Sequence, residues 1–172
     1  MSSRRLFFAL WPDHRQRDRM RDFISPIARL VEGRAIDRRN WHVTLAYIGE
    51  FPEKRIDELL EIKRLIQFEP FRLRWDRLEF WPRPKIAALV PPIVPPELER
   101  LVENLKGCVF AAGVNPEYQR VYRPHITVVR NARTFETHRL AQSALTEWSS
   151  FELVESVPAP GEASYRPIVN DF

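Results

Sequence analysis

Two short segments of this chain carry the same arrangement of chemically active side chains. Residues 41–45 have the sequence Trp-His-Val-Thr-Leu, and residues 124–128 have the sequence Pro-His-Ile-Thr-Val. Each segment places a histidine two residues before a threonine, with apolar residues between and after them. With 4 His and 5 Thr in 172 residues, chance produces two such pairs with odds of roughly 0.5 %. The repeat is therefore treated as one functional feature.

The spacing predicts the direction in which these side chains point. Side chains alternate between the two faces of a β-strand, so His42 and Thr44 share one face, and His125 and Thr127 share one face in the second copy. Two imidazoles suit acid–base chemistry near neutral pH, one as the base and the other as the acid. Hydroxyl groups suit the oxygens of a phosphate group. The repeat therefore predicts acid–base chemistry on a phosphate compound.

The other residue types in the chain exclude several kinds of functional site. Cys108 is the single cysteine, which excludes an intrachain disulfide framework and a cysteine-rich zinc site. No cluster of carboxylates with histidine has metal-ligand spacing, and the 5 glycines form no glycine-rich phosphate loop. His14 and His138 lack a threonine two residues later, and we expect both at the surface. We expect no metal and no cofactor.

The basic residues of the chain are unusually rich in arginine. The net charge is +4, and four of the 27 basic residues are lysines, so 23 are arginines. Arginine binds phosphate in a planar, bidentate manner better than lysine does, which favours an RNA or nucleotide partner. A genomic codon bias would produce the same excess, so composition alone leaves both explanations open.

The chain shows no signal for export or membrane insertion. Residues 3–8 resemble a twin-arginine signal, but the apolar stretch at residues 6–11 is only six residues long and stops at Pro12. A signal peptide has an apolar region of about 7–15 residues, and a membrane helix needs ~20. We therefore expect a cytoplasmic protein with no membrane partner.

Strands and helices that position the repeat can be assigned from hydrophobic periodicity. Strands are expected at 6–11, 41–48, 71–80, 85–90, 123–130, 151–157 and 165–169. Helices are expected after Pro12 as far as Val31 with a kink or break at Pro26, and at 52–66, 95–112 and 135–148. The order of these elements follows no strict βαβ rhythm, which predicts an α+β fold.

Both repeat segments and their surroundings resemble the 2H phosphoesterases, whose signature is two His-x-Thr-x tetrapeptides. The similarity is greater to the RNA 2′,3′-cyclic phosphodiesterases, also called 2′-5′ RNA ligases, and it covers nearly the whole chain. The similar segments are residues 5–10, 41–49, 80–89, 123–130, and Tyr165 following Gly161. The chain departs from the family at Val128, where Leu is commoner, and at Ala87-Ala88, where bulkier residues including Trp are usual.

The resemblance implies a fold, a reaction and a partner. It implies one domain, residues 1–172, with two lobes related by a pseudo-twofold axis and one motif in each half. Antiparallel sheets would line a central cleft, with helices outside. The implied reaction is metal-independent hydrolysis of an RNA terminal 2′,3′-cyclic phosphate to a 2′-phosphate, and 2′-5′ RNA ligation stays open as a further activity. The implied partners are RNA ends or oligonucleotides that bear this cyclic phosphate, bound by a monomer.

The resemblance also implies a role for each motif residue. His42 would be the proton donor to the leaving 3′ oxygen, and His125 the proton acceptor that activates water. Thr44 and Thr127 would bind the phosphate oxygens, and Arg130 would help to bind the phosphate. Strict alternation places Arg130 on the face opposite His125, so this role requires the strand to end or bulge by residue 130. Otherwise Arg130 is a surface cation.

Two other functions stay open at this point. The motifs recognise a phosphate and carry little information about the groups attached to it. A phosphodiesterase of 2′-5′ oligonucleotides or of small cyclic nucleotides would therefore have the same motifs. A non-catalytic RNA-binding domain is a further alternative, but binding alone does not require two titratable groups.

Overall fold

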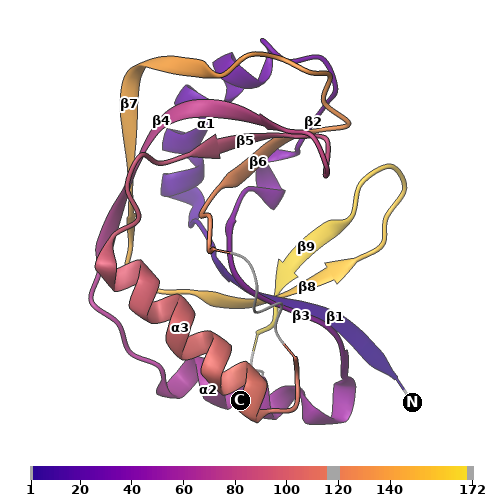
Figure 1. Ribbon diagram of the computed structural model, residues 1–172. Coiled ribbons are helices and arrows are strands. Elements are labelled where there is room, and N and C mark those ends of the chain that lie inside the picture. The colour runs from indigo at the N-terminus through magenta and orange to yellow at the C-terminus, as the bar shows by residue number, and fades with distance from the viewer. Residues whose placement is uncertain (1, 116–120, 170–172) are drawn as a thin grey trace.

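The computed structural model of the protein describes residues 2–115 and 121–169, which form two antiparallel β-sheets with α-helices outside them (Figure 1). The first sheet has the strand order β3-β1-β8-β9, with bounds Val43–Pro52, Ser3–Leu10, Glu152–Val157 and Ser164–Pro167. The second has the order β2-β6-β5-β4-β7, with bounds Arg34–Ala35, Ile126–Arg130, Ile86–Val90, Phe71–Trp81 and His138–Trp148. All pairings are antiparallel, so the predicted α+β class is confirmed.

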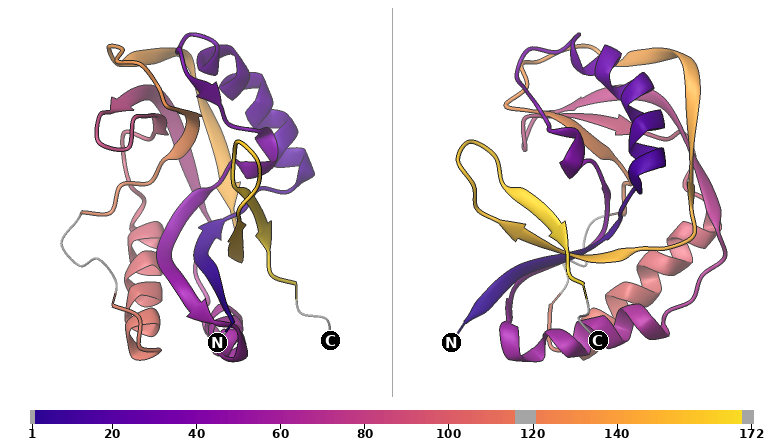
Figure 2. Two further views of the ribbon diagram at one scale, coloured as in Figure 1. Left: turned by 90° about the vertical axis from the view of Figure 1, so that its right-hand side faces the viewer. Right: turned by 180° about the vertical axis from the view of Figure 1, so that it is seen from behind.

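The α-helices divide between the two sheets. Helix α1 (His14–Ala28) contacts β6 and β7 of the second sheet, whereas α2 (Ile56–Leu65) contacts β8 and α3 (Pro96–Ala111) contacts β3 of the first sheet (Figure 2). Short 3₁₀ helices occupy Arg38–Asn40 and Glu53–Arg55. Pro26 lies in the last turn of α1, so the helix is not split there but ends at Ala28, short of the predicted Val31. This arrangement leaves the facing sides of the two sheets free of helices.

One cluster of buried apolar side chains extends through both sheets. It includes Phe8 of β1 and Trp75 of β4, both fully buried. The residues that alternate with the motif histidines and threonines all belong to it: Val43, Leu45, Ile126 and Val128. Because these side chains are held in the core, the histidines and threonines must face the other way. Core packing therefore fixes the face on which the chemistry lies.

The helix predicted at 135–148 is wrong, because this segment forms the edge strand β7. Leu140, Ala144 and Trp148 are spaced by four residues, which fits one face of a helix and equally fits one face of a strand. The structure uses the second pattern, since β7 pairs with β4 and so covers an otherwise open strand edge. The buried Thr146 hydroxyl accepts hydrogen bonds from the indole N–H groups of Trp75 (3.0 Å) and Trp148 (2.9 Å). The Trp75 bond crosses from β4 to β7 and so helps to hold β7 in register.

The other predicted elements are present, with ends shifted by a few residues. The seven predicted strands correspond to β1, β3, β4, β5, β6, β8 and β9, and the remaining three helices to α1, α2 and α3. No sequence pattern predicted β2 or the two 3₁₀ helices. In the described part of the chain, no helix is long and apolar enough to cross a membrane.

Candidate active site

A cleft of about 1010 Å³ lies between the two sheets and contains all five residues singled out in the sequence. The first sheet supplies Thr44 and the second Thr127 and Arg130, while His42 and His125 each directly precede a strand. The tip of the β4–β5 turn and the β8–β9 hairpin face each other across one end of the cleft (Figure 1). The other two histidines line no part of it: His14 is exposed on α1, and His138 is half-buried in β7 rather than at the surface.

Each cleft histidine is held through the same ring nitrogen. His42 Nδ1 lies 2.7 Å from the carbonyl oxygen of Asn40, and His125 Nδ1 lies 2.9 Å from that of Arg123. A carbonyl oxygen can only accept, so Nδ1 carries a proton in both rings and Nε2 is the position that gains or loses one. In His42, Nε2 also lies 3.2 Å from the Thr44 hydroxyl. The two imidazoles are therefore prepared in the same tautomer.

A β-bulge places Arg130 in the cleft. The residues on either side of Val128 pair with two consecutive residues of β5, Ala87 and Ala88, so Val128 is an extra residue in the strand. The insertion reverses the alternation after it. Arg130 therefore returns to the face of His125 and lines the cleft, as the role implied by the family resemblance requires.

The first motif contains a bulge at the equivalent position. Thr44 lies opposite Ala9 and the next paired residue of β3, Ala46, lies opposite Phe8, so Leu45 is the extra residue. Tyr47 consequently lines the cleft, three residues after the motif threonine, as Arg130 does in the second motif. The internal repeat thus extends beyond the His-x-Thr pattern to include the bulge.

The cleft is strongly positive. It is lined by Arg5, Arg34, Arg83, Arg123 and Arg130 and by one carboxylate, Glu162. Within residues 2–115 and 121–169, only Arg123 of these arginines has a carboxylate partner, Glu79, at 2.8 Å. The Glu162 carboxylate accepts a hydrogen bond from Asn40 at 3.0 Å. Arginines without carboxylate partners favour an anionic ligand, and guanidinium groups match phosphate geometry.

The electrostatics of the cleft favour the neutral form of both imidazoles when no ligand is bound. Burial is the largest cause that lowers the pKa of His42, to about 4, and positive charge on His125, when that ring is protonated, and on Arg130 and Arg17 lowers it further. Burial also lowers the pKa of His125, with contributions from Arg123 and Arg130. A neutral Nε2 is ready to act as a base. The acid form needs a compensating negative charge, which a bound phosphate would supply.

Three aromatic rings lie beside His42, and sequence reasoning did not assign any of them to the site. The ring centroids of Phe7, Trp11 and Tyr165 lie 5.0, 5.9 and 5.2 Å from that of His42. These residues come from β1, from the segment after it and from β9. No local pattern links them to the motif, because they meet His42 through the pairing of distant strands. They exclude water from one side of the imidazole.

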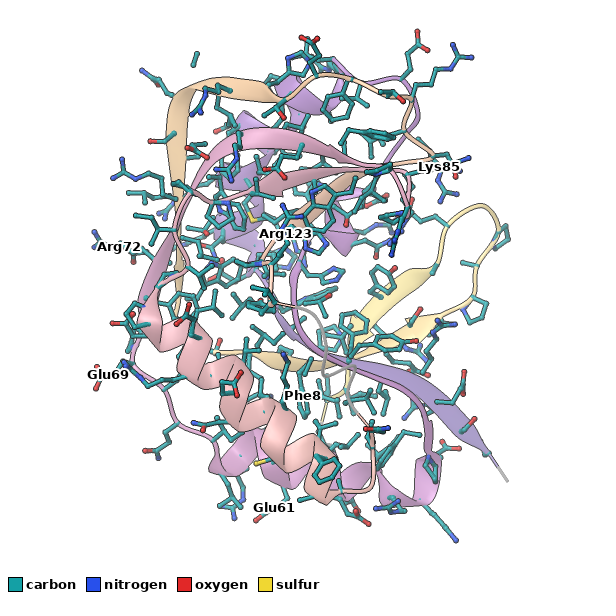
Figure 3. The ribbon with its side chains drawn as sticks, viewed as in Figure 1. Phe8, Glu61, Glu69, Arg72, Lys85 and Arg123 are labelled. Atoms are coloured by element: carbon teal, nitrogen blue, oxygen red, sulfur yellow. The ribbon has the colours of Figure 1, made fainter. Side chains whose placement is uncertain are left out.

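A second aromatic contact supports His125. The Trp81 ring centroid lies 4.3 Å from that of His125, and the Arg123 guanidinium stacks on the same indole at 4.4 Å. Glu79 accepts hydrogen bonds from the Trp81 indole N–H (3.2 Å) and from Arg123 (2.8 Å). Arg123 lies between the two sheets (Figure 3). The hairpin that has alanine at residues 87 and 88 thus contributes an aromatic ring from Trp81.

Two side chains support the turn before His42. The Asn40 amide donates to Glu162 and to the carbonyl of Ala163, and its oxygen accepts from the backbone N–H of Tyr165. The Arg17 guanidinium donates to the carbonyls of residues 38 and 41. The β8–β9 hairpin and α1 therefore both fix the backbone that holds His42. Among the described residues, no three His, Cys, Asp or Glu side chains gather as a metal site needs.

Two known proteins are similar to this chain in sequence. The RNA 2′,3′-cyclic phosphodiesterase of Aeropyrum pernix is 32% identical over 115 residues, which span 65% of this chain and 64% of the relative, slightly less than two thirds of its length. The protein of the same name from Archaeoglobus fulgidus is 24% identical over 131 residues, 75% of this chain and 73% of that protein.

Solved structures show the same fold. The crystal structure of E. coli LigT complexed with 3′-AMP has a TM-score of 0.85 and 26% identity, over 98% of this chain and 97% of LigT. A structure described as a phosphoesterase has a TM-score of 0.83 and 25% identity, over 98% and 97% of the two chains. The sequence model of the 2′-5′ RNA ligase superfamily matches residues 12–155. Because that match covers most of the chain, the protein belongs to the 2′-5′ RNA ligase superfamily, that of the 2H phosphoesterases.

Proposed function

We propose that the protein is a phosphodiesterase that hydrolyses the 2′,3′-cyclic phosphate at an RNA end to a 2′-phosphate without a metal. The observation that carries the proposal is the pair of imidazoles, each anchored at Nδ1 by a backbone carbonyl and lining one positive cleft. The names of the two archaeal relatives support this reaction, and the 3′-AMP in E. coli LigT supports a nucleotide ligand.

The chemistry assigns one proton transfer to each histidine. Nε2 of His125 takes a proton from water as the water oxygen attacks phosphorus. Nε2 of His42 gives a proton to the 3′ oxygen as the bond between phosphorus and that oxygen breaks. The products are a 2′-phosphate and a 3′-hydroxyl, and solvent then returns the two histidines to their starting states. General acid and base catalysis each contribute about 10²–10⁴-fold in rate.

Phosphate binding would prepare His42 for its role as the acid. The pKa of about 4 leaves this imidazole neutral at pH 7 before substrate binds. A phosphate anion beside Nε2 favours the charged form and raises that pKa. Thr44, Thr127 and Arg130 would hold the phosphate oxygens, with hydroxyl and guanidinium donors suited to them. The assignment of acid to His42 and base to His125 follows the family resemblance.

Residues 1–172 would act as one domain in which each half supplies a histidine and a threonine. A phosphodiesterase of 2′-5′ oligonucleotides or small cyclic nucleotides would use the same groups. A binding domain has no use for two imidazoles that are both anchored through Nδ1 so that Nε2 can exchange a proton. This difference favours an enzyme over a non-catalytic RNA-binding protein.

The decisive experiment is turnover of a short RNA with a 2′,3′-cyclic end, with products separated against 2′- and 3′-phosphate standards. We expect a 2′-phosphate and no inorganic phosphate. A 3′-phosphate product would exchange the roles of His42 and His125. Tight binding with no more turnover than the double variant H42A/H125A shows would support the binding domain instead.

A further inference from the structure

The two-residue strand β2 places a second arginine beside Arg130. Gly33 precedes it with a φ of +151°, and a Cβ there would lie 2.7 Å from Val129 Cγ1 and 2.9 Å from the Arg130 carbonyl oxygen. Only glycine allows so close an approach of the two strands. The approach pairs Arg34 directly with Arg130. The close approach at Gly33 therefore lies directly before Arg34, the second arginine that lines the cleft.

Arg34 and Arg130 form a pair of like charges. Residues directly opposite each other in an antiparallel pair point to the same face, and like charges there are destabilising. Arg130 donates to the neutral Tyr165 hydroxyl at 3.4 Å. Arg34 Nε is buried and has no hydrogen-bond partner within the described residues. A buried donor left unpaired is costly, so the pair becomes favourable only when an anion joins it.

Arg34 and Arg130 differ in their electrostatic reach to the histidines. The reacting phosphate must lie near the histidines, and Arg130 lowers the pKa of both, so it is within electrostatic reach of that point. Arg34 is on the edge strand β2, one strand beyond Arg130. The charges that lower the pKa of His42 and His125 include Arg130 but not Arg34, so Arg34 lies farther from the reacting phosphate.

We infer that Arg34, together with Arg130, forms a subsite for a second phosphate, the internucleotide phosphate next to the cyclic end. The inference rests on the proposed function and names its substrate class: oligonucleotides rather than cyclic mononucleotides. The same cleft would bind a mononucleotide through the reacting phosphate alone. The wild-type protein should therefore prefer a substrate with at least two phosphates.

Binding measurements test the subsite without turnover. The probes are adenosine 2′-monophosphate and the dinucleotide ApA with a terminal 2′-phosphate, both products of the proposed reaction. We expect the R34Q variant to lose about tenfold more affinity for the dinucleotide than for the mononucleotide, the loss of one charge-assisted hydrogen bond. For the dinucleotide, the slope of the logarithm of the association constant against the logarithm of the salt concentration should be about 0.7 less steep in R34Q than in the wild-type protein. Hydrolysis of the matching cyclic substrates should show the same difference in kcat/KM.

A charge-matched control separates the subsite from general electrostatics. Arg72 lies on the opposite edge of the molecule from the β4–β5 turn, marked by Lys85, and pairs with Glu147 at 2.8 Å (Figure 3). R72Q removes the same charge and should keep the wild-type preference for the dinucleotide. The melting temperature of R34Q should not fall, because a like-charge pair is removed. The affinity of R34K for the dinucleotide should lie between the affinities of R34Q and the wild-type protein.

Two outcomes would overturn the subsite. If R34Q lost the same factor of affinity for the mononucleotide and for the dinucleotide, Arg34 would bind the reacting phosphate instead. Equal affinity of the wild-type protein for the two probes would show that no second phosphate is bound. Absence of hydrolysis with normal dinucleotide preference would reject the proposed function and leave the subsite standing.

Discussion

The phenolic hydroxyl of Tyr122 donates a hydrogen bond of 2.8 Å to the backbone carbonyl of Thr44. Tyr122 lies three residues before His125, so this bond ties the segment that leads into the second motif to the strand of the first. Burial raises the pKa of the hydroxyl, which keeps it protonated as a donor. The bond is a direct polar link between the two halves of the site.

Tyr122→Phe should weaken this link without removing the ring. We expect the free energy of unfolding to fall by about 1 kcal/mol, the usual net value of one hydrogen bond. The kcat should fall about fivefold with KM little changed, because the histidines lose alignment rather than phosphate affinity. Tyr47→Phe is the control for stability, since its hydroxyl bonds to Arg5 in an exposed position. Denaturant unfolding and steady-state kinetics provide both measurements, and an unchanged kcat in Tyr122→Phe would rule out the positioning role.

Removing either cleft imidazole should abolish most of the activity. His42→Ala and His125→Ala should each lower kcat by about 10²–10⁴-fold, since each removes one proton-transfer group. Circular dichroism should show an unchanged fold. His14→Ala is the matched control, because that side chain is exposed on α1, and it should retain full activity. Comparable damage from His14→Ala would mean that the two motif histidines are not the acid–base pair.

The pH dependence should report the lowered histidine pKa values. The rate falls below the lower pKa because the base becomes protonated, and above the higher pKa because the acid loses its proton. Both pKa values are lowered in the free protein, His42 to about 4, so the optimum of kcat/KM should lie below pH 6.5. The optimum of kcat should lie higher, since the bound phosphate raises both values. A kcat/KM that rises steadily to pH 10 would indicate attack by free hydroxide instead.

Chelation should leave the activity intact. Both proton-transfer positions in the proposed reaction are imidazole nitrogens, and arginines supply the positive charge that a metal would otherwise provide. Hydrolysis of the cyclic RNA end should proceed at the same rate with excess EDTA and without it. A loss of turnover that a divalent cation restores would exclude the metal-independent mechanism.

The sequence predicted the parts of the site that depend on local pattern. His42, Thr44, His125 and Thr127 were identified from a two-residue spacing, and the structure places all four in one cleft. The position of Arg130 could not be settled, because a β-bulge depends on strand pairing and has no sequence signal of its own. The same holds for the rings around His42, which come from other strands.

The errors in the predicted fold have a similar origin. The spacing of Leu140, Ala144 and Trp148 fits a helix and a strand equally well, and the open edge of β4 decides in favour of the strand. The strand β2 has two residues, too few to show a period, and it exists because Gly33 permits a close approach. Contacts between distant segments, rather than local preference, determine both elements.

The bulges at Leu45 and Val128 each shift the alternation of side chains along their strand by one residue. Each extra residue separates a motif threonine from a later side chain that the cleft also uses, Tyr47 in one half and Arg130 in the other. Deleting one residue between Thr44 and Tyr47, or between Thr127 and Arg130, would keep the strand. It would direct the side chain of Tyr47 or Arg130 toward the core instead of the cleft. These two intervals should therefore tolerate substitution far better than insertion or deletion.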